Sequence, residues 1–300
     1  MSAPRNKLSR RIFLFVSLAA LGAHSAAAYG RIGHWLTGEV AQQLLSPSAN
    51  NWTHIVLPQY GGSLALAALW ADEVKPAWSS PHHYVNPATD CSPLSTEPCN
   101  CILTAIANHT ARLIAPLATT DARSEALKFA IHYIGDIHQP LHVSGRFKGG
   151  TQMTVVFDKR TVSLHEVWDY LMLEHRQKSL GLSRTAYAQH LLANHPAPSR
   201  CPASNPAPPF DSNTNPLPLV VCPQLWGSES VLLNCDTVWK GLSAASRNTD
   251  LADEYYARVI DVVEAGVVAA GYRIAAVIEA AVVAIEAGSH ETDGVLVVQT

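Results

Sequence analysis

Apolar residues recur at three- and four-residue spacing over most of this 300-residue chain. Such spacing places apolar side chains along one face of an α-helix. The segments with this pattern are 33–46, 63–76, 101–116, 122–138, 164–178, 184–194, 226–246 and 251–287. A strand-like run, Gln152 to Phe157, forms a small predicted hairpin with Thr161 to Ser163. Residues 195–223, rich in Pro, Ser and Asn, indicate a long surface loop. We therefore expect a mainly α-helical single domain with a minor β hairpin.

Residues 1–28 have the composition of a secretory signal peptide. A basic region, an apolar region and a small-residue cleavage site follow one another: Lys7, Arg10 and Arg11, then Ile12 to Leu21, then Ala26-Ala27-Ala28. Cleavage there predicts a mature chain that begins at Tyr29 and forms one domain over 29–300. It removes four basic residues, so the formal net charge changes from −3 to −7. This acidic balance argues against binding long duplex DNA through a basic surface.

The cysteine content agrees with export from the cytoplasm. Disulfides are the usual state of cysteines in exported chains. The pairing is left open by the sequence, although Cys99 and Cys101 are too close in the chain to favour a bond with each other. The six cysteines are Cys91, Cys99, Cys101, Cys201, Cys222 and Cys235. We expect a secreted protein or a resident of the secretory pathway.

Two further sequence features concern the surface of the exported protein. The sequons that start at Asn51 and Asn108 predict glycosylation. The apolar stretch 259–287 contains charged residues, which predicts an amphipathic helix and no transmembrane segment. These charged residues are Asp261, Glu264, Arg273 and Glu279.

Two His-x-x-x-Asp pairs, His132/Asp136 and His165/Asp169, lie in predicted helices. Residues four apart share a helix face, with Cβ atoms about 5–6 Å apart. An imidazole and a carboxylate placed in this way can occupy two positions around one metal ion. Each pair alone is also compatible with a buried histidine that has a carboxylate partner. His142, just past the Pro140 that stops the predicted helix 122–138, favours a metal site because it adds a third imidazole.

Further nitrogen and oxygen donors lie upstream. Signal cleavage would give Tyr29 a free α-amino group, whose unperturbed pKa of roughly 8 lets a metal displace its proton near neutral pH. Asp72 is equally compatible with a surface acid, and Tyr84 with a core aromatic. The nine candidate ligand residues contain no thiolate, which favours zinc in a multinuclear site. They are Tyr29, His34, Asp72, His83, His132, Asp136, His142, His165 and Asp169.

Several motifs together resemble the zinc-dependent single-strand-specific nucleases, also called 3′-nucleotidase/nucleases. The strongest blocks are His132-Tyr133-Ile134-Gly135-Asp136-Ile137-His138-Gln139-Pro140-Leu141-His142 and Leu164-His165-Glu166-Val167-Trp168-Asp169. Support comes from Tyr29-Gly30-x-x-Gly33-His34, Trp70-Ala71-Asp72-Glu73-Val74-Lys75, His83-Tyr84-Val85-Asn86, Gly149-Gly150, Trp226-Gly227-Ser228-Glu229-Ser230 and Ala270-Gly271-Tyr272-Arg273-Ile274-Ala275. The resemblance covers most of the mature chain.

The resemblance implies the helical fold of zinc-dependent phospholipase C and a site for three zinc ions. One zinc would bind Asp72, His83, His132 and Asp136; a second would bind His142, His165 and Asp169; a third would bind Tyr29, His34 and Asp136. Asp72 would orient the nucleophile and Lys75 would face the scissile phosphate. Tyr84 would stack on a base to which Asn86 hydrogen-bonds.

The activity that the resemblance implies is hydrolysis of single-stranded RNA and DNA to 5′-phosphate products, and of 3′-nucleotides. No stable protein partner is implied, and we expect a monomer. Three positions depart from the usual family pattern: Tyr29 replaces Trp, Lys75 replaces Arg, and Thr151 replaces Asn.

Two alternative functions remain open: a phospholipase C-like phosphodiesterase and a non-catalytic metal-binding protein. A metalloprotease is disfavoured, because His165-Glu166-x-x-Asp169 lacks the second histidine of the HExxH motif.

Overall fold

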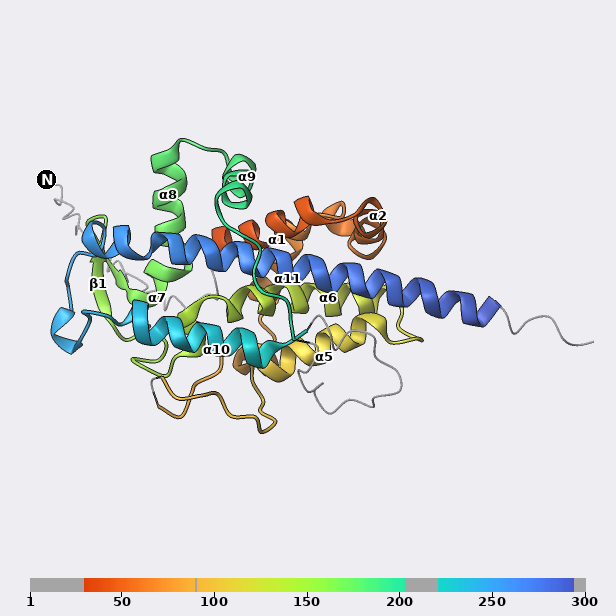
Figure 1. Cartoon of the computed structure of the whole chain (residues 1–300), viewed down its shortest axis with the longest axis horizontal. Helices are drawn as coiled ribbons and strands as arrows, with labels where there is room; N and C mark the ends of the chain where they lie inside the picture. Colours follow the sequence, from red (N-terminus) through yellow and green to blue (C-terminus); the bar gives the residue numbers. More distant parts are fainter. Residues whose placement is uncertain (1–29, 90, 203–220, 294–300) are drawn as a thin grey trace, which may run out of the picture.

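The computed structural model describes residues 30–89, 91–202 and 221–293, with side chains up to residue 287. The predicted signal peptide 1–28, Tyr29 and most of the predicted loop 195–223 lie outside these residues. The described part is mainly α-helical with one two-stranded antiparallel sheet, so the predicted fold class is confirmed. Figure 1 shows the helices packed around the long α11, which runs the length of the molecule.

Five predicted helical segments correspond to single helices. These are α1 (Arg31–Leu44), α5 (Ile102–Ile114), α6 (Thr120–Ile137), α9 (Arg184–Asn194) and α11 (Glu254–Asp293). Three other predicted segments are interrupted in the structure. The predicted segment 63–76 corresponds to α3 (Leu64–Ala67) and α4 (Trp70–Val74). The segment 164–178 corresponds to α7 (Leu164–Glu166), the π-helical turn η4 (Val167–Leu171) and α8 (Met172–Leu180). The segment 226–246 corresponds to α10 (Pro223–Leu233) and the π-helical turn η6 (Asn234–Val238).

The periodicity missed one helix, α2 (Pro47–Val56). Its start has a local signal, because the Ser46 side chain accepts a hydrogen bond from the amide of Ala49 and Pro47 occupies the first turn. The backbone amide and hydroxyl of Ser46 also donate to Glu279 of α11, at 2.6 and 2.9 Å. A contact with a residue 233 positions away therefore helps to hold α2 in place.

The hairpin is formed by β1 (Thr154–Phe157) and β2 (Arg160–Ser163), in a register from Thr154↔Ser163 to Phe157↔Arg160. The two turn residues, Asp158 and Lys159, both have positive φ, as type I′ hairpin turns require. Ser163 then caps α7 in a reciprocal capping box with Glu166. This cap fixes the start of the helix that carries His165.

Two clusters of buried hydrophobic residues form the core, and α11 contributes to both. Its first half supplies Val259, Val263 and Val267 to one cluster. Its second half supplies Ile274 and Ile278 to the other. Helix α6 belongs to the cluster of the second half, whereas α1 and α7 pack mainly in the cluster of the first half. Side chains that project from α1, α6 and α7 can therefore meet where the clusters adjoin.

Among the described residues, the segment Glu254–Ala287 of α11 is long and apolar enough to cross a membrane by length and composition. Its apolar residues are instead packed into both core clusters. Two buried charges on it have partners within the protein, because Glu264 accepts from Tyr187 and Arg273 pairs with Glu229. These contacts are those of a core helix, and they explain the apolar composition of α11.

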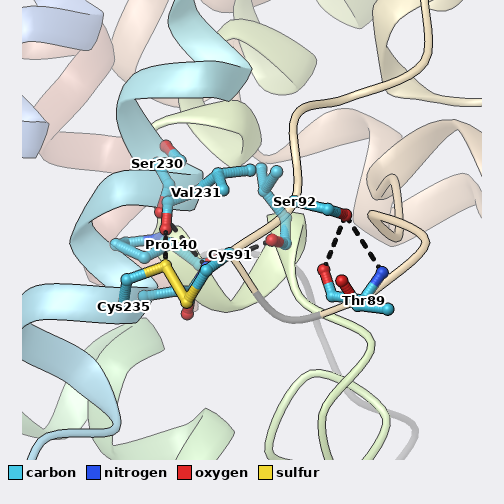
Figure 2. Close-up of a disulfide and its surroundings, with 9 residues drawn as sticks. Thr89, Cys91, Ser92, Pro140, Ser230, Val231 and Cys235 are labelled. Carbon is cyan, nitrogen blue, oxygen red and sulfur yellow. Dashed lines mark hydrogen bonds between the residues drawn. A yellow bond between two sulfur atoms is a disulfide. The ribbon is translucent and has the colours of Figure 1, made fainter.

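Three disulfides join Cys91 to Cys235, Cys99 to Cys101 and Cys201 to Cys222. The expectation that Cys99 and Cys101 would not pair was wrong. The chain bends between them so that their Cα atoms lie 5.2 Å apart, within the range that a disulfide spans. Figure 2 shows the Cys91–Cys235 bond, which ties the loop after Asn86 to η6, beside Pro140.

Candidate metal centre

Helix α6 supplies the centre of a buried histidine–carboxylate cluster. His132 and Asp136 lie one turn apart and are fully buried, with Nε2 and Oδ2 3.3 Å apart. His83, at the end of the 3₁₀ helix η2 (Ala77–His83), places Nδ1 2.9 Å from the same Oδ2. His34 of α1 places Nε2 3.2 Å from Oδ1. Asp136 thus faces histidines from three separate elements.

The second pair lies where α7 continues into η4. Nε2 of His165 is 3.1 Å from Oδ2 of Asp169. His142, on the short 3₁₀ helix η3 (Pro140–Val143), places Nε2 3.5 Å from the other oxygen, Oδ1. All three side chains are buried.

The described residues contain three groups whose ligand atoms lie within 4.8 Å of one another and could hold a metal ion. They are His34, His132 and Asp136; Asp72, His83 and His132; and His142, His165 and Asp169. Eight of the nine candidate ligand residues therefore come together. The ninth, Tyr29, lies outside the described residues.

Three of the histidines are oriented by backbone carbonyl groups. Nδ1 of His132, His142 and His165 lies 2.7, 2.6 and 2.6 Å from the carbonyl oxygens of Ala68, His83 and Gly149, respectively. A carbonyl oxygen accepts only, so each Nδ1 must donate its proton. In a neutral ring, Nε2 is then an unprotonated ligand aimed into the cluster, as is usual for metal-binding histidines.

The cluster fits a metal centre in its donor chemistry. Oδ1 of Asp136 and Nε2 of His142 are buried and make no well-aligned hydrogen bond with the described residues, although Nε2 of His34 and Oδ1 of Asp169 lie 3.2 and 3.5 Å from them, respectively. Buried polar atoms without partners are costly, and a bound ion is one reason for their presence. The donors of the described cluster are imidazole and carboxylate groups, a set that suits zinc.

The ionised carboxylates in the cluster also favour cation binding. Burial alone would raise the pKa of Asp136, but His132, His142 and His34 outweigh it and hold this pKa well below its ordinary value. Burial likewise opposes ionisation of Asp169, yet His165 and His142 lower its pKa to about 2. Burial, followed by the nearby His34, lowers the pKa of His132 far below its usual value. Ionised carboxylates and a neutral imidazole are the forms that bind metal. Burial opposes protonation of His142, but Asp136 and Asp169 outweigh it and raise its pKa to about 9, so a bound cation would have to displace that proton.

Gln139 is a site residue to which the sequence analysis assigned no role. Its Nε2 donates a 2.6 Å hydrogen bond to Oδ1 of Asp169, and its Oε1 accepts from the Leu141 amide at 2.6 Å. The side chain therefore orients Asp169 and anchors the turn before His142. The sequence signal that could have indicated this role is the position of Gln139 between the two ligand motifs.

A cleft of about 660 Å³ opens over the cluster. Its lining includes Asp72, Lys75, Tyr84, Asn86, His142 and His165. Lys75 follows α4 in the left-handed region, with φ 33°, and places Nζ 3.4 Å from Oδ1 of Asp72. The structure thus brings both predicted catalytic residues to the cleft.

Tyr84 and Asn86 share one face of an extended segment, since alternate residues of extended chain point the same way. Between them, the amide of Val85 donates to the carbonyl of His142 at 2.9 Å, which fixes the segment beside the cluster. The side chain of Tyr84 is 45% exposed in the cleft lining, so the alternative of a core aromatic is excluded.

A helical fold with a buried histidine–carboxylate cluster beneath a cleft defines the class of this chain: a helical protein with an accessible candidate site for several metal ions. The S1/P1 nuclease family model matches residues 29–283. The chain is 32% identical to Nuclease P1 of Penicillium citrinum over 260 residues, 82% of this chain and 95% of that protein. It is 31% identical to Nuclease S1 of Aspergillus oryzae and to Endonuclease 2 of Arabidopsis thaliana, in each case over 83% of this chain and 90% and 88% of those proteins. The chain belongs to the S1/P1 nuclease family.

Proposed function

We propose that this protein is a zinc-dependent endonuclease that hydrolyses single-stranded RNA and DNA to 5′-phosphate products and also hydrolyses 3′-nucleotides. One observation carries the proposal: three groups of candidate metal ligands, two of which share His132, lie beneath a cleft that also contains an exposed tyrosine and a lysine. Membership of a family whose members include Nuclease P1 and Nuclease S1 supports the reaction class.

In this proposal three zinc ions are held by the predicted sets. Asp72, His83, His132 and Asp136 hold one, His142, His165 and Asp169 a second, and Tyr29, His34 and Asp136 the third. Bound zinc supplies Lewis acidity that polarises phosphoryl oxygens and lowers the pKa of water. The amino group and carbonyl of Tyr29 become ligands after cleavage behind Ala28, and the family match that begins at residue 29 supports this start.

Asp72 and Lys75 have complementary roles at the cleft. The Asp72 carboxylate, partly buried beside His132, orients the attacking water. The Lys75 ammonium is more exposed and can approach a phosphate while remaining paired with Asp72. It stabilises the negative charge that develops on the phosphate oxygens.

The exposed ring of Tyr84 provides a face for one base, and the Asn86 amide can hydrogen-bond to its edge. A base in a duplex reaches Tyr84 only after extrusion from the stack, which costs a few kcal/mol. The site therefore prefers single strands. A phospholipid has no base that this pair could bind, so these residues favour a nucleotide substrate over a lipid.

Export is the proposed route of this protein. The three disulfides are typical of oxidising compartments. Asn51 and Asn108, the two sequon asparagines, are exposed on α2 and α5 and accessible to glycosylation. We propose a secreted or secretory-pathway monomer with residues 1–28 removed.

The test is zinc analysis of the purified mature protein together with turnover assays before and after chelation. The substrates are single-stranded DNA, the same sequence as a duplex, a 3′-nucleotide and phosphatidylcholine. We expect about three zinc ions per chain and chelator-sensitive cleavage that favours the single strand. Cleavage of phosphatidylcholine alone would support the phospholipase alternative. Bound zinc without turnover of any substrate would support the non-catalytic one.

A further inference from the structure

Residues 147–150 form an unusual turn at the wall of the cleft. Phe147, Lys148, Gly149 and Gly150 have φ values of 48°, 51°, 60° and 79° in succession. A left-handed conformation costs a residue with a Cβ roughly 1–2 kcal/mol. Backbone bonds from Gly150 to Arg146 and from Gln152 to Phe147, both 3.0 Å, hold the turn in place.

Gly149 explains part of this turn. Its carbonyl accepts the hydrogen bond from Nδ1 of His165, and a Cβ at this position would lie 2.6 Å from the carbonyl oxygen of Leu141. The left-handed path thus orients a metal-ligand candidate. The same path carries Lys148 to the lining of the cleft.

Lys148 contributes nothing to the metal cluster. Its side chain is exposed, and no ion pair or side-chain hydrogen bond is formed by its ammonium group among the described residues. The other lysine in the cleft lining, Lys75, is paired with Asp72. Lys148 therefore brings an uncompensated positive charge to the cleft of a chain whose formal net charge is −3.

Thr151 strengthens this placement. Its hydroxyl donates a 2.9 Å hydrogen bond to the carbonyl of Lys148. The threonine that stands where the resemblance predicts an asparagine is thus engaged in the turn. The cationic group at this part of the lining is Lys148.

We propose that Lys148 binds the phosphate next to the scissile one, so that substrates with at least two phosphates bind better than substrates with one. This inference rests on the proposed nuclease function. A lysine ammonium recognises a phosphate as a point charge and needs no fixed approach geometry. Two cations in one cleft can hold two successive phosphates of a single strand, Lys75 at the reacting phosphate and Lys148 at its neighbour.

The experiment compares a dinucleoside monophosphate, which has only the scissile phosphate, with the corresponding trinucleoside diphosphate. The test variant is Lys148→Asn, because asparagine tolerates the left-handed region. Lys148→Arg keeps the charge. Lys159→Asn is the matched control, since Lys159 is also exposed and left-handed, with φ 65°, but lies in the hairpin turn and not in the cleft lining.

We expect Lys148→Asn to raise KM for the trinucleotide by about 2- to 5-fold, the usual effect of one exposed ion pair. Both kcat and the KM for the dinucleotide should stay constant. The salt dependence of log(kcat/KM) for the trinucleotide should become less steep by roughly 0.7, the contribution of one phosphate contact in a single strand. Lys148→Arg and Lys159→Asn should behave as the wild type.

Two results would overturn the inference alone: unchanged kinetics on both substrates, or an equal rise in KM for both, which would place Lys148 at the scissile phosphate. Zinc content and melting temperature of each variant identify an effect of misfolding. If Lys148→Asn misfolds, Lys148→Arg is the deciding variant: because it keeps the positive charge, the inference requires that it keep the preference for the trinucleotide. A wild-type protein that cleaves neither substrate would overturn the proposed function itself and this inference with it.

Discussion

His34 of α1 and Asp136 of α6 meet with Nε2 and Oδ1 3.2 Å apart, and their side chains are 1% and 0% exposed. The His34 ring packs closely over Gly135, where a Cβ would lie 3.0 Å from its Nδ1. The contact between His34 and Asp136 joins α1 to α6, the helix at the centre of the candidate metal site. Assembly of the site is therefore linked to packing of α1 against α6.

Replacing Asp136 tests this linkage. We expect Asp136→Ala to abolish activity and to lower the free energy of unfolding by about 3–5 kcal/mol, because it leaves buried histidines without their carboxylate partner. Loss of bound metal would add to this effect. Zinc analysis and denaturant unfolding provide the measurements, with exposed Asp261→Ala as the control. A variant with full zinc content and wild-type stability would show that Asp136 is not a metal ligand.

The exposed ring of Tyr84 can be tested separately from the metals. Tyr84→Ala should weaken binding of single-stranded substrates by about 1–3 kcal/mol, the usual contribution of a base–aromatic stack. Zinc content and cleavage of a simple non-nucleotide phosphodiester should be unchanged. Tyr84→Phe, which keeps the ring, is the matched control. Equal losses on both kinds of substrate would contradict a stacking role.

Gln139 should affect one metal position more than the others. Its amide donates to Asp169, and a partner of a metal ligand typically contributes 10- to 100-fold to metal affinity. We expect Gln139→Glu to release one zinc ion at a lower chelator concentration than the wild type, because it exchanges a donor for a negative charge. Exposed Gln189→Glu on α9 adds the same charge outside the cluster and serves as the control. Identical zinc titration curves for all three proteins would assign Gln139 a purely structural role.

The N-terminus predicted for the mature chain can be tested with one added residue. A protein with methionine before Tyr29 lacks the free α-amine there, so we expect it to lose the third zinc ion and most activity. The other two ligand sets consist of side chains and should stay filled. Tyr29→Trp on the natural terminus should retain activity, because backbone atoms are the proposed ligands. Three zinc ions and full turnover in the extended protein would refute the role of the amine.

His109 predicts a change in acid stability away from the cluster. Burial, followed by the nearby Arg112 and His82, lowers the pKa of His109 to about 3 from an unfolded value of 6.5. Below pH 6.5 the unfolded chain therefore binds a proton at His109 that the folded chain does not bind. The contribution of His109 to the free energy of unfolding is fully present above pH 6.5 and is lost as the pH decreases toward 3. Between pH 7 and pH 5, the free energy of unfolding of His109→Phe should decrease by roughly 1–2 kcal/mol less than that of the wild type.

Denaturant unfolding of wild type and His109→Phe at both pH values provides the measurement, and exposed His54→Phe is the control. The difference between proteins cancels any pH effect of the metal site that they share. An unchanged pH dependence in His109→Phe would show that His109 is protonated in the folded protein.

The sequence by itself determined features that depend on near neighbours in the chain. Helical periodicity predicted α1, α5, α6, α9 and α11, because an amphipathic stripe is a local property. The spacing of four placed His132 with Asp136 and His165 with Asp169, because such residues share a helix face. The motifs also indicated the family and the residues of the cleft.

Tertiary structure alone decided how these pieces combine. No local pattern specifies that Asp136 faces His34 and His83, which lie 102 and 53 positions away. Carbonyl groups of distant residues orient the imidazoles, as Ala68 does for His132, 64 positions away. Helix α2 depends in part on Glu279, and the cysteine pairing depends on how the loops fold back. These contacts form only when both hydrophobic clusters pack together, because the free energy that compensates for chain ordering comes from burial across the whole molecule.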